Sequence, residues 1–315
     1  MKIRSFSSGP RSTTTKYLKP IALAVGLALS LVGCSQGAAE VDPAQPTTGI
    51  DIGVALPESI AEAGTLKVGV RCDYPGRGYK DENGDNAGVG PDMARQFAEY
   101  AFGDPEKAEL TCVTADNRIP YLTSNRVDLL IAALGITAER DEVIDFSNGY
   151  YAGAAKILTR ADAPELAGIE DLEGEVLLAL SGTPYTKFGD KCVPDSTTRN
   201  YKGLSDALTD LVNDRGFAIL HDGASISELA DSNPSVKVNG PDLPFGFSSA
   251  VGIRQGESEV SDWVNAAIAK MQEDDKFAEI IDANLTGALK EEAINWIPRP
   301  DQSPDYSTFT GEPVC

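Results

Sequence analysis

Arg140 stands at a point of the sequence where a carboxylate could bind. It follows a buried apolar run, residues 128–132, and Thr137 lies three positions before it. If Thr137 caps a helix, Arg140 falls in the first helical turn. Free backbone N–H groups, the helix dipole and the guanidinium then converge at the carboxyl end of a strand, where α/β sheets bind ligands. The alternative is an arginine in a surface salt bridge.

A second helix start of the same kind follows the apolar run 175–180. Thr183 would cap it, and Pro184 would take the first helical position. Two such starts favour one anionic group clamped between two lobes, although routine capping is the alternative. Asp222 follows a third apolar run, 216–220, where a carboxylate could accept hydrogen bonds from an ammonium. The alternative for Asp222 is an Asx turn with the glycine after it.

Aromatic and acidic side chains follow the first apolar run, residues 66–70. Asp73, Tyr74 and Tyr79 could form the wall of an apolar side-chain pocket, and partial surface packing is the alternative for the two tyrosines. The chain has one histidine, His221, which we expect in the core or at the edge of a cleft rather than in catalysis. A single histidine argues against a His-based metal site, and we expect no metal and no cofactor.

Composition excludes several classes of protein. The 315 residues include 48 acidic and 27 basic side chains, so the formal charge is 27 − 48 = −21. This charge argues against a nucleic-acid partner, because the phosphate backbone repels it. A chain that is 42% hydrophobic and 24% charged is globular, and its length allows one large or two medium domains.

The N-terminus has the pattern of an export signal. Residues 1–19 are basic, and the apolar run 21–33 covers about 20 Å as a helix, too short for a hydrocarbon core of about 30 Å. The run ends in Leu-Val-Gly-Cys, which resembles the bacterial lipobox with Cys34 as the lipidated residue. An ordinary signal peptide with a coincidental cysteine is the alternative. We therefore expect a signal peptide over 1–33, a flexible tether over 34–56, and an extracytoplasmic protein anchored by lipid to the cell membrane of a bacterium.

Export also suits the remaining four cysteines, an even number in an oxidising compartment. Four cysteines allow three connectivities. If Cys72 and Cys112 lie on neighbouring parallel strands, a bridge between them is geometrically easy. Cys192 and Cys315 would then tie down the C-terminal tail. Free buried thiols are the alternative.

Short apolar runs alternate with amphipathic helical patterns from about residue 57 onward. This alternation predicts an α/β fold with parallel sheets and right-handed crossovers. Several prolines after Trp296 exclude a helix there, so we expect the tail to run over the surface. The candidate strands are 66–70, 110–114, 128–132, 155–159, 175–180, 216–220 and 250–254, and the helical stripes run over 93–101, 204–212 and 260–271.

Several short segments, specific in their order and spacing, resemble family 3 of the bacterial extracellular solute-binding proteins, the amino-acid-binding subunits of ABC importers. The resemblance covers residues 57 to about 287. It implies two Venus-flytrap lobes, each a mostly parallel sheet flanked by helices, joined by two crossing strands. Lobe 1 would take 57–153 and 250–290, lobe 2 would take 154–249, and 291–315 would be a tail. The matching segments are GTLKVGV (64–70), GVGPDMA (88–94), RIPYL (118–122), RVDLL (126–130), TAER (137–140), DFSNGYY (145–151), SGT (181–183) and AILHD (218–222).

The resemblance also implies roles for single residues. In this family an arginine at the position of Arg140 holds the α-carboxylate of the ligand, and backbone N–H groups at the positions of Gly135 and Thr183 assist. An aspartate at the position of Asp222 takes the α-ammonium. These roles agree with the interpretation of the same residues above.

The resulting functional expectation is a monomeric binding protein rather than an enzyme. It would capture an amino acid or similar small zwitterion outside the cell and deliver it to an ABC permease in the membrane. Two alternatives stay open: an enzyme on the same fold, such as a cyclohexadienyl-type dehydratase, and the ligand sensor of a separate signalling partner.

Overall fold

Two β-sheets organise the part of the chain that the computed structural model describes, residues 49–315 apart from 244, 308 and 314. The described residues belong to one compact unit. The predicted signal peptide 1–33, the predicted lipidation site Cys34 and most of the predicted tether 34–56 lie outside the described residues.

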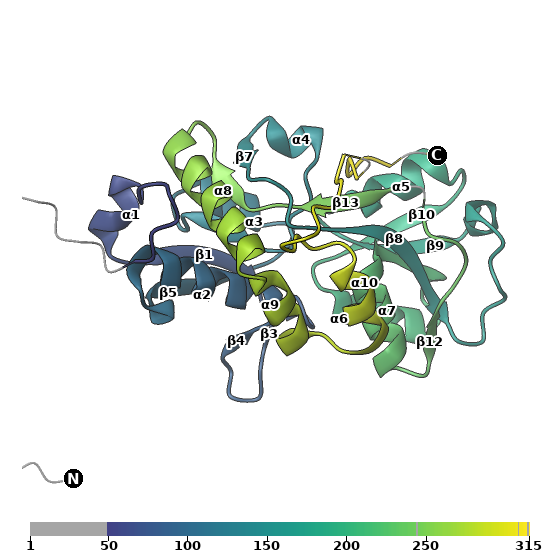
Figure 1. The fold of residues 1–315 in the computed structure, drawn as a ribbon. Coiled ribbons are helices and arrows are strands. Elements are labelled where there is room, and N and C mark those ends of the chain that lie inside the picture. Colours follow the sequence, from purple (N-terminus) through teal and green to yellow (C-terminus); the bar gives the residue numbers. More distant parts are fainter. Residues whose placement is uncertain (1–48, 244, 308, 314) are drawn as a thin grey trace, which may run out of the picture. The chain divides into compact units, whose positions relative to one another are not determined.

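The first sheet has the strand order β5-β1-β6-β14-β7. Figure 1 labels its strands β1, β5 and β7. β1 (Leu66–Arg71) is its central parallel strand, with β5 and β6 on either side, whereas β14 is antiparallel to β6 and β7. Residues of α2, α8 and α9 share one apolar cluster with β1, and α3 packs on the other face. This double cover explains why β6 is wholly apolar and why all of β1 except Lys67 is buried. The other strands are β5 (Ala108–Val113), β6 (Leu129–Ile131), β7 (Ile144–Phe146) and β14 (Gly252–Arg254).

The second sheet has the strand order β10-β9-β11-β8-β12. β9 is parallel to β10 and β11, while β8 runs antiparallel to β11 and β12. α5 packs on one face, and α6 and α7 pack on the other. Its strands are β8 (Tyr151–Arg160), β9 (Val176–Leu180), β10 (Thr197–Tyr201), β11 (Ala218–Asp222) and β12 (Val236–Val238).

The chain passes between the two sheets along a pair of antiparallel strands. β8 leaves the first sheet after β7, and β13 (Gly246–Ser249) returns to it before β14. The start of β8 pairs with β13, from Tyr151 opposite Ser249 to Ala154 opposite Gly246. The two passages run in opposite directions, which is why both sheets contain antiparallel pairs. The α/β fold expected from the sequence is confirmed, with sheets that are mixed rather than wholly parallel.

The helices bury the apolar faces that their sequence patterns predict. Met93, Phe97, Trp263 and Met271 are all fully buried, whereas Val212, at the end of the predicted 204–212 stripe, is 39% exposed. The helices are α1 (Glu58–Ala63), α2 (Val89–Phe102), α3 (Arg118–Thr123), α4 (Ala138–Asp141), α5 (Tyr185–Cys192), α6 (Leu204–Val212), α7 (Gly223–Ser232), α8 (Ser258–Glu273), α9 (Lys276–Asn284) and α10 (Gly287–Ile294), with 3₁₀ turns at Pro105–Lys107 and Ile169–Leu172.

A small antiparallel sheet follows β1, and the sequence patterns did not predict it. It consists of β2 (Asp73–Tyr74), β3 (Gly78–Lys80) and β4 (Asn86–Ala87). Strands of two or three residues are too short to show a period-2 pattern. The turn between β2 and β3 contains Arg77, which lies in the cavity described below.

Both predicted disulfides are present. Cys72 follows β1 directly and pairs with Cys112 of the neighbouring β5, with their Cα atoms 5.5 Å apart. Cys192, the last residue of α5, pairs with Cys315, with a Cα separation of 5.1 Å. The first bridge therefore fixes the end of β1, and the second fixes the end of the chain.

The C-terminal tail runs without a helix from Asn295 to the second disulfide, over the residues that are described. Phe309 packs edge-on against Trp296, and the Gly311 N–H donates to the Gly246 carbonyl of β13. Further on, the Lys191 ammonium donates to the Pro313 carbonyl. The tail thus follows β13 and ends against α5, as the prediction of a surface course requires.

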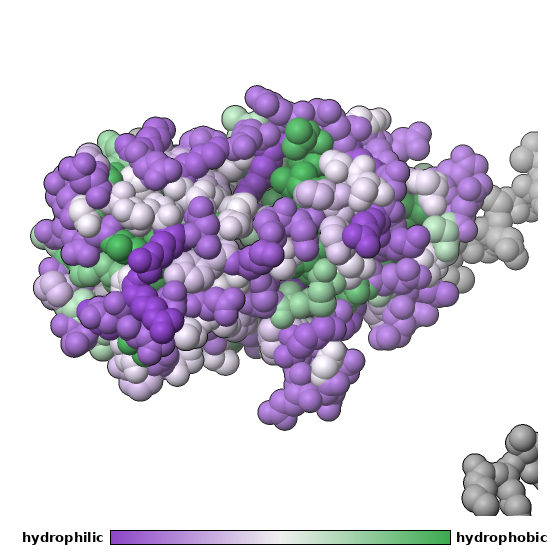
Figure 2. Space-filling model, turned by 180° about the vertical axis from the view of Figure 1, so that it is seen from behind, coloured by the Kyte–Doolittle hydropathy of each residue, from purple (hydrophilic) through white to green (hydrophobic). Residues whose placement is uncertain are grey.

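Few large hydrophobic side chains are exposed among the described residues. Figure 2 shows one face on which polar and charged residues predominate and hydrophobic residues form small separate patches. This surface agrees with the net charge of −21. Within the described residues, no helix combines the length and the apolar character needed to cross a bilayer.

The first disulfide generates a stability prediction. Cys72→Ala/Cys112→Ala removes a bridge between residues 40 positions apart, which in the loop-entropy model lowers the free energy of unfolding by about 4 kcal/mol. Denaturant unfolding under oxidising conditions measures this loss. In the presence of a reductant, the wild type and the variant should unfold at similar midpoints. An unchanged midpoint under oxidising conditions would contradict the stabilising role.

Candidate ligand-binding site

One cavity collects residues from both sheets and from the strands that connect them. Gly135 and Arg140 come from the segment after β6, and Thr183 and Asp222 come from the ends of β9 and β11. The described cavity lining also includes Tyr74, so five of the predicted ligand-binding residues meet there. The other lining residues are Arg71, Arg77, Arg118, Ala133, Tyr151, Gly153, Pro184, Tyr185, His221, Phe247 and Ser249.

Arg140 occupies the position that the sequence predicts. Thr137 has extended backbone dihedral angles, and its hydroxyl accepts a hydrogen bond from the Arg140 N–H at 3.3 Å, so the predicted cap of α4 is confirmed. The guanidinium donates to the Gly135 carbonyl at 2.6 Å and to the Gly182 carbonyl at 2.8 Å. Burial lowers the pKa of Arg140 to about 10, which leaves it cationic at neutral pH. A buried cation therefore lies between the two sheets.

Gly135 has a steric reason to be glycine. A Cβ atom on Gly135 would come within 2.5 Å of the Phe247 ring. A side chain at this position would force Phe247 out of the cavity wall. Any hydrogen bond that Gly135 gives to a ligand must therefore come from its backbone.

The helix start at Thr183 differs from the prediction. α5 begins at Tyr185 with Pro184 in the N-cap position and no side-chain cap, so the prediction of Thr183 as the cap and Pro184 as the first helical residue is wrong. The Thr183 hydroxyl instead donates to the Leu180 carbonyl at 2.6 Å, and its N–H contacts the same oxygen at 3.2 Å. The turn therefore directs both the hydroxyl and the N–H of Thr183 to the last residue of β9. Thr183 still lines the cavity, but its backbone donor is already used within this turn.

Gly182 allows the segment after β9 to lie close to the segment after β5. It has a φ of +74°, and a Cβ atom there would lie 2.5 Å from the Ala115 carbonyl oxygen, in the segment after β5. Only glycine combines this left-handed backbone with so close an approach. The same approach brings the Gly182 carbonyl to Arg140.

Asp222 ends β11 and caps α7. Its carboxylate accepts hydrogen bonds from the backbone N–H and the hydroxyl of Ser225, both at 3.2 Å. The Asp222 side chain therefore caps the N-terminus of α7, as in an Asx turn, and also lines the cavity. Burial raises the pKa of Asp222 to about 6. Above that pH the carboxylate is charged, so it can accept hydrogen bonds from a ligand ammonium.

His221 links Asp222 to Tyr74 across the cavity. The Nδ1 of His221 lies 2.8 Å from an Asp222 carboxylate oxygen and 3.3 Å from the Tyr74 hydroxyl. Burial, and secondarily the repulsion from nearby arginines, lower the pKa of His221 to about 3, so the ring is neutral at physiological pH. A neutral ring that donates from Nδ1 to the carboxylate keeps Asp222 in place. The ring is 4% exposed, which confirms the expected buried position.

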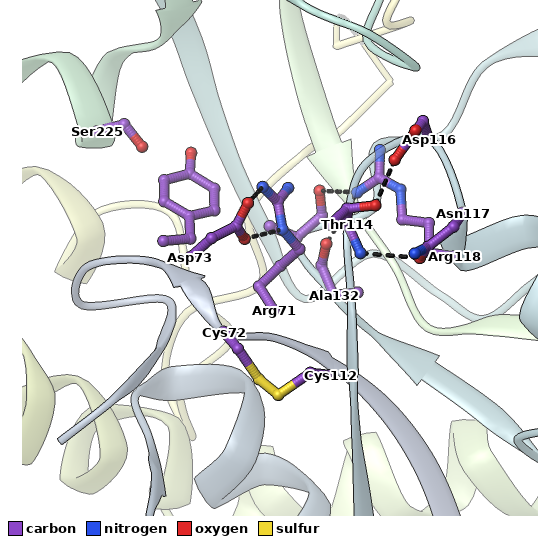
Figure 3. A network of polar contacts seen from close by, with 12 residues as sticks. Arg71, Cys72, Asp73, Cys112, Thr114, Asp116, Asn117, Arg118, Ala132 and Ser225 are labelled. Atoms are coloured by element: carbon purple, nitrogen blue, oxygen red, sulfur yellow. Dashed lines mark hydrogen bonds and ion pairs between the residues drawn. A yellow bond between two sulfur atoms is a disulfide. The ribbon is translucent and has the colours of Figure 1, made fainter. Parts of the chain in front are cut away.

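Three arginines in the cavity were not identified from the sequence. Arg71, the last residue of β1, makes a bidentate ion pair with Asp73, with nitrogen–oxygen distances of 2.7 and 3.0 Å (Figure 3). Arg118 at the start of α3 is 2% exposed and donates to the carbonyls of Ala132 and Ala133 at 2.8 and 3.0 Å. Figure 3 also shows the Cys72–Cys112 bridge directly beside Arg71. The third arginine is Arg77.

Two predicted ligand-binding residues do not line the cavity. Asp73 pairs with Arg71 instead, and Tyr79 lies opposite Asp73 in the β2–β3 ladder. The predicted aromatic wall exists, but residues other than Tyr79 form most of it. Tyr185 stacks on His221 at 5.1 Å between ring centroids, and Phe247 meets Tyr185 edge-on.

The cavity has the features of a site for a small polar molecule rather than a metal. It combines aromatic walls with buried charges of both signs. Among the described residues, no group of three or more His, Cys, Asp or Glu side chains could hold a metal ion.

Comparison with known proteins identifies a family. Residues 66–286 match the family model of bacterial extracellular solute-binding proteins, family 3. The ABC transporter glutamine-binding protein of Bacillus subtilis is 28% identical over 227 residues, which cover 70% of this chain and 81% of that protein. Other relatives are named as arginine- or cystine-binding proteins, some of them of ABC transporters, and these names describe binding proteins rather than enzymes.

Solved structures show the same two-lobed fold. The solute receptor for L-cysteine of Neisseria gonorrhoeae is 30% identical, has a TM-score of 0.69, and the match covers 72% of this chain and 92% of that chain. An ancestral amino-acid-binding protein described as a precursor of cyclohexadienyl dehydratase is 27% identical, with a TM-score of 0.66 and coverage of 72% and 98%.

The raised pKa of Asp222 generates a prediction about pH. Between about pH 4 and pH 6 the folded protein keeps a proton that the unfolded chain has released, so stability falls as pH rises. Asp222→Asn removes this titration and retains a capping side chain. Between pH 4.5 and pH 7.5 the wild type should therefore lose about 2 kcal/mol of stability relative to the variant.

Urea unfolding of both proteins without ligand at the two pH values measures this difference. Asp242→Asn, at an exposed position, serves as the matched control and should leave the pH dependence of the wild type unchanged. A wild-type to Asp222→Asn difference that does not vary with pH would contradict a buried carboxylate at this site.

Proposed function

The chain belongs to family 3 of the bacterial extracellular solute-binding proteins, and from this premise we propose that it is the substrate-binding lipoprotein of an ABC importer. It binds a free amino acid or similar small zwitterion outside the cytoplasm and delivers it to a membrane permease. The observation that carries the proposal is that Arg140 and Asp222 line one cavity, Arg140 in the segment after β6 of the first sheet and Asp222 at the end of β11 of the second.

The two side chains match the two ends of an amino acid. Arg140 provides a cationic donor for the α-carboxylate, and Asp222 provides an acceptor for the α-ammonium. The Arg140 guanidinium donates hydrogen bonds to the Gly135 and Gly182 carbonyls. A ligand carboxylate would compete with these carbonyls for the same N–H groups. Charge-assisted hydrogen bonds contribute about 1.5–3 kcal/mol each, so a few of them supply much of the roughly 8 kcal/mol that micromolar affinity requires.

We further propose that the two sheets belong to two lobes that close on the ligand. Lobe 1 comprises residues 57–153 and 250–290, lobe 2 comprises 154–249, and the tail is 291–315. β8 and β13 form the connection about which the lobes move. Closure requires only that the ligand binds the closed arrangement more tightly than the open one.

The environment of His221 argues against an enzyme on this fold. A general acid or base works best with a pKa near the working pH, whereas burial holds the pKa of His221 at about 3. Its hydrogen bond to Asp222 fits a role in positioning that carboxylate.

Removal of the Arg140 guanidinium tests the binding proposal. In a thermal-shift and calorimetry panel of the common amino acids, at least one should stabilise the wild type saturably and remain chemically unchanged. Arg140→Ala should weaken that binding by about 100-fold or more, because it removes charged hydrogen bonds worth about 3 kcal/mol or more. Arg126→Ala, which removes an exposed arginine in the same half of the molecule, should bind as the wild type does.

The outcomes separate the candidate functions. Conversion of a bound ligand to product would favour an enzyme. Absence of any amino-acid binding, or binding that Arg140→Ala leaves intact, would contradict the proposal.

Lipid anchoring has its own test. Cys34→Ala removes the thiol that the proposed acyl chains modify, so the protein should move from the detergent phase to the aqueous phase on phase partitioning of cells that express it. Incorporation of labelled palmitate into the wild type and not into the variant is the second measurement. Equal partitioning of the two proteins would contradict an anchor at Cys34.

A further inference from the structure

The cavity contains more positive than negative charge. Its described lining includes Arg71, Arg77, Arg118 and Arg140, but only one acidic residue, Asp222. This excess is opposite in sign to the net charge of the chain, −21. Because isolated buried charges are strongly unfavourable, a group of buried arginines requires compensating anions.

The protein itself compensates only part of this charge. Asp73 neutralises Arg71 through a bidentate pair. Arg118 and Arg140 donate to backbone carbonyls, which satisfy their N–H groups without cancelling their charge. Burial, and next the positive charge of Arg140 and Arg71, lower the pKa of Arg118, which is the direction expected where cations are crowded.

Arg77 is the least compensated of the four. It is 8% exposed, its Nε has no hydrogen-bond partner, and none of the described carboxylates forms an ion pair with it. Its guanidinium lies over the ring of Tyr151, 3.6 Å from the centroid. Such a contact is favourable but supplies no negative charge.

The backbone holds Arg77 firmly at this place. The Gly90 N–H donates to the Arg77 carbonyl at 2.9 Å, at the start of α2. A Cβ atom on Gly88 would lie 2.9 Å from the Arg77 carbonyl carbon, so the helix start packs directly on this turn. The position of Arg77 is therefore built into the fold.

Other buried polar atoms around the cavity also lack partners. Among the described residues these include the Nε of Arg118, the hydroxyl of Tyr151 and the Nε2 of His221, all from residues that line the cavity. Buried polar groups are normally hydrogen-bonded. Their concentration here indicates that a polar ligand completes them, and the unpartnered Nε donors of Arg77 and Arg118 suit an anion. Glu292 on α10 is paired with Lys156, with a nitrogen–oxygen distance of 2.9 Å.

An amino acid with an uncharged side chain would leave the excess positive charge in place. Its carboxylate and ammonium cancel each other, so it adds no net charge to the cavity. We propose that the ligand carries a second carboxylate, as glutamate and aspartate do, and that Arg77 binds it. This inference rests on the proposed function and names its ligand class. The same charges exclude lysine and arginine, whose side chains would enter a cationic site.

Calorimetry near pH 7.5 with glutamate, aspartate, glutamine, asparagine and arginine tests the proposal. Glutamate or aspartate should bind about 10- to 100-fold more tightly than its own amide, the range that one charged hydrogen bond provides, and arginine should not bind. Arg77→Gln should reduce the preference of acid over amide to a fewfold difference or less. Arg126→Gln is the matched control and should keep the wild-type preference, because its side chain is exposed.

The outcomes distinguish this inference from the function on which it rests. If a neutral or basic amino acid binds as tightly as the acids, and Arg140→Ala abolishes that binding, the inference is wrong and the proposed function stands. If no amino acid binds, both fail. The comparison of acid with amide in the wild type decides the inference even if Arg77→Gln does not fold.

Discussion

The site depends on the hydrogen bonds that the Arg140 guanidinium makes to segments of both sheets. One of its hydrogen bonds goes to the Gly135 carbonyl, close in sequence, and the other goes to the Gly182 carbonyl at the end of β9. A buried guanidinium cannot leave these donors unused without a large cost in free energy. Backbone carbonyls of Gly135 and Gly182 satisfy it. A carboxylate offers the same donors a charged partner, which is the kind of difference in affinity that can shift a population of conformers.

A second polar connection crosses the cavity beside this one. Tyr74, in the segment after β1, contacts His221 at the end of β11, and His221 contacts Asp222. Because the imidazole is buried and neutral, it can orient the carboxylate without adding charge. Arg140 presents a positive charge to the cavity, whereas the Tyr74–His221–Asp222 series presents the negative carboxylate of Asp222. The cavity therefore has a positive and a negative group, which the two opposite charges of a zwitterion can match.

The sequence predicts those parts of the site whose interactions connect residues close together in the chain, and it misses those that depend on residues further away. The Thr137 cap and Asp222 were predictable because a strand end and the residues after it determine them locally. The two disulfides were predictable from export and strand order. Arg77 and Arg118 were missed because their burial depends on distant residues: Gly88 and Gly90 pack against the Arg77 turn, and the carbonyls of Ala132 and Ala133 receive Arg118. Thr183 was predicted as a cap because its residue type fits, but its hydroxyl contacts Leu180 instead.

The second disulfide changes how the chain is connected. Cys192 and Cys315 close residues 192–315 into a covalent ring that includes β13, β14 and the helices α8 to α10. The tail part of this ring lies along β13, where the Gly311 N–H bonds to Gly246, before it reaches α5. Beside the two connecting strands β8 and β13, the tail closed by this disulfide is thus a third covalent connection between the two halves. The covalent length of this tail, in addition to packing, therefore limits the amplitude of the proposed movement of one lobe against the other.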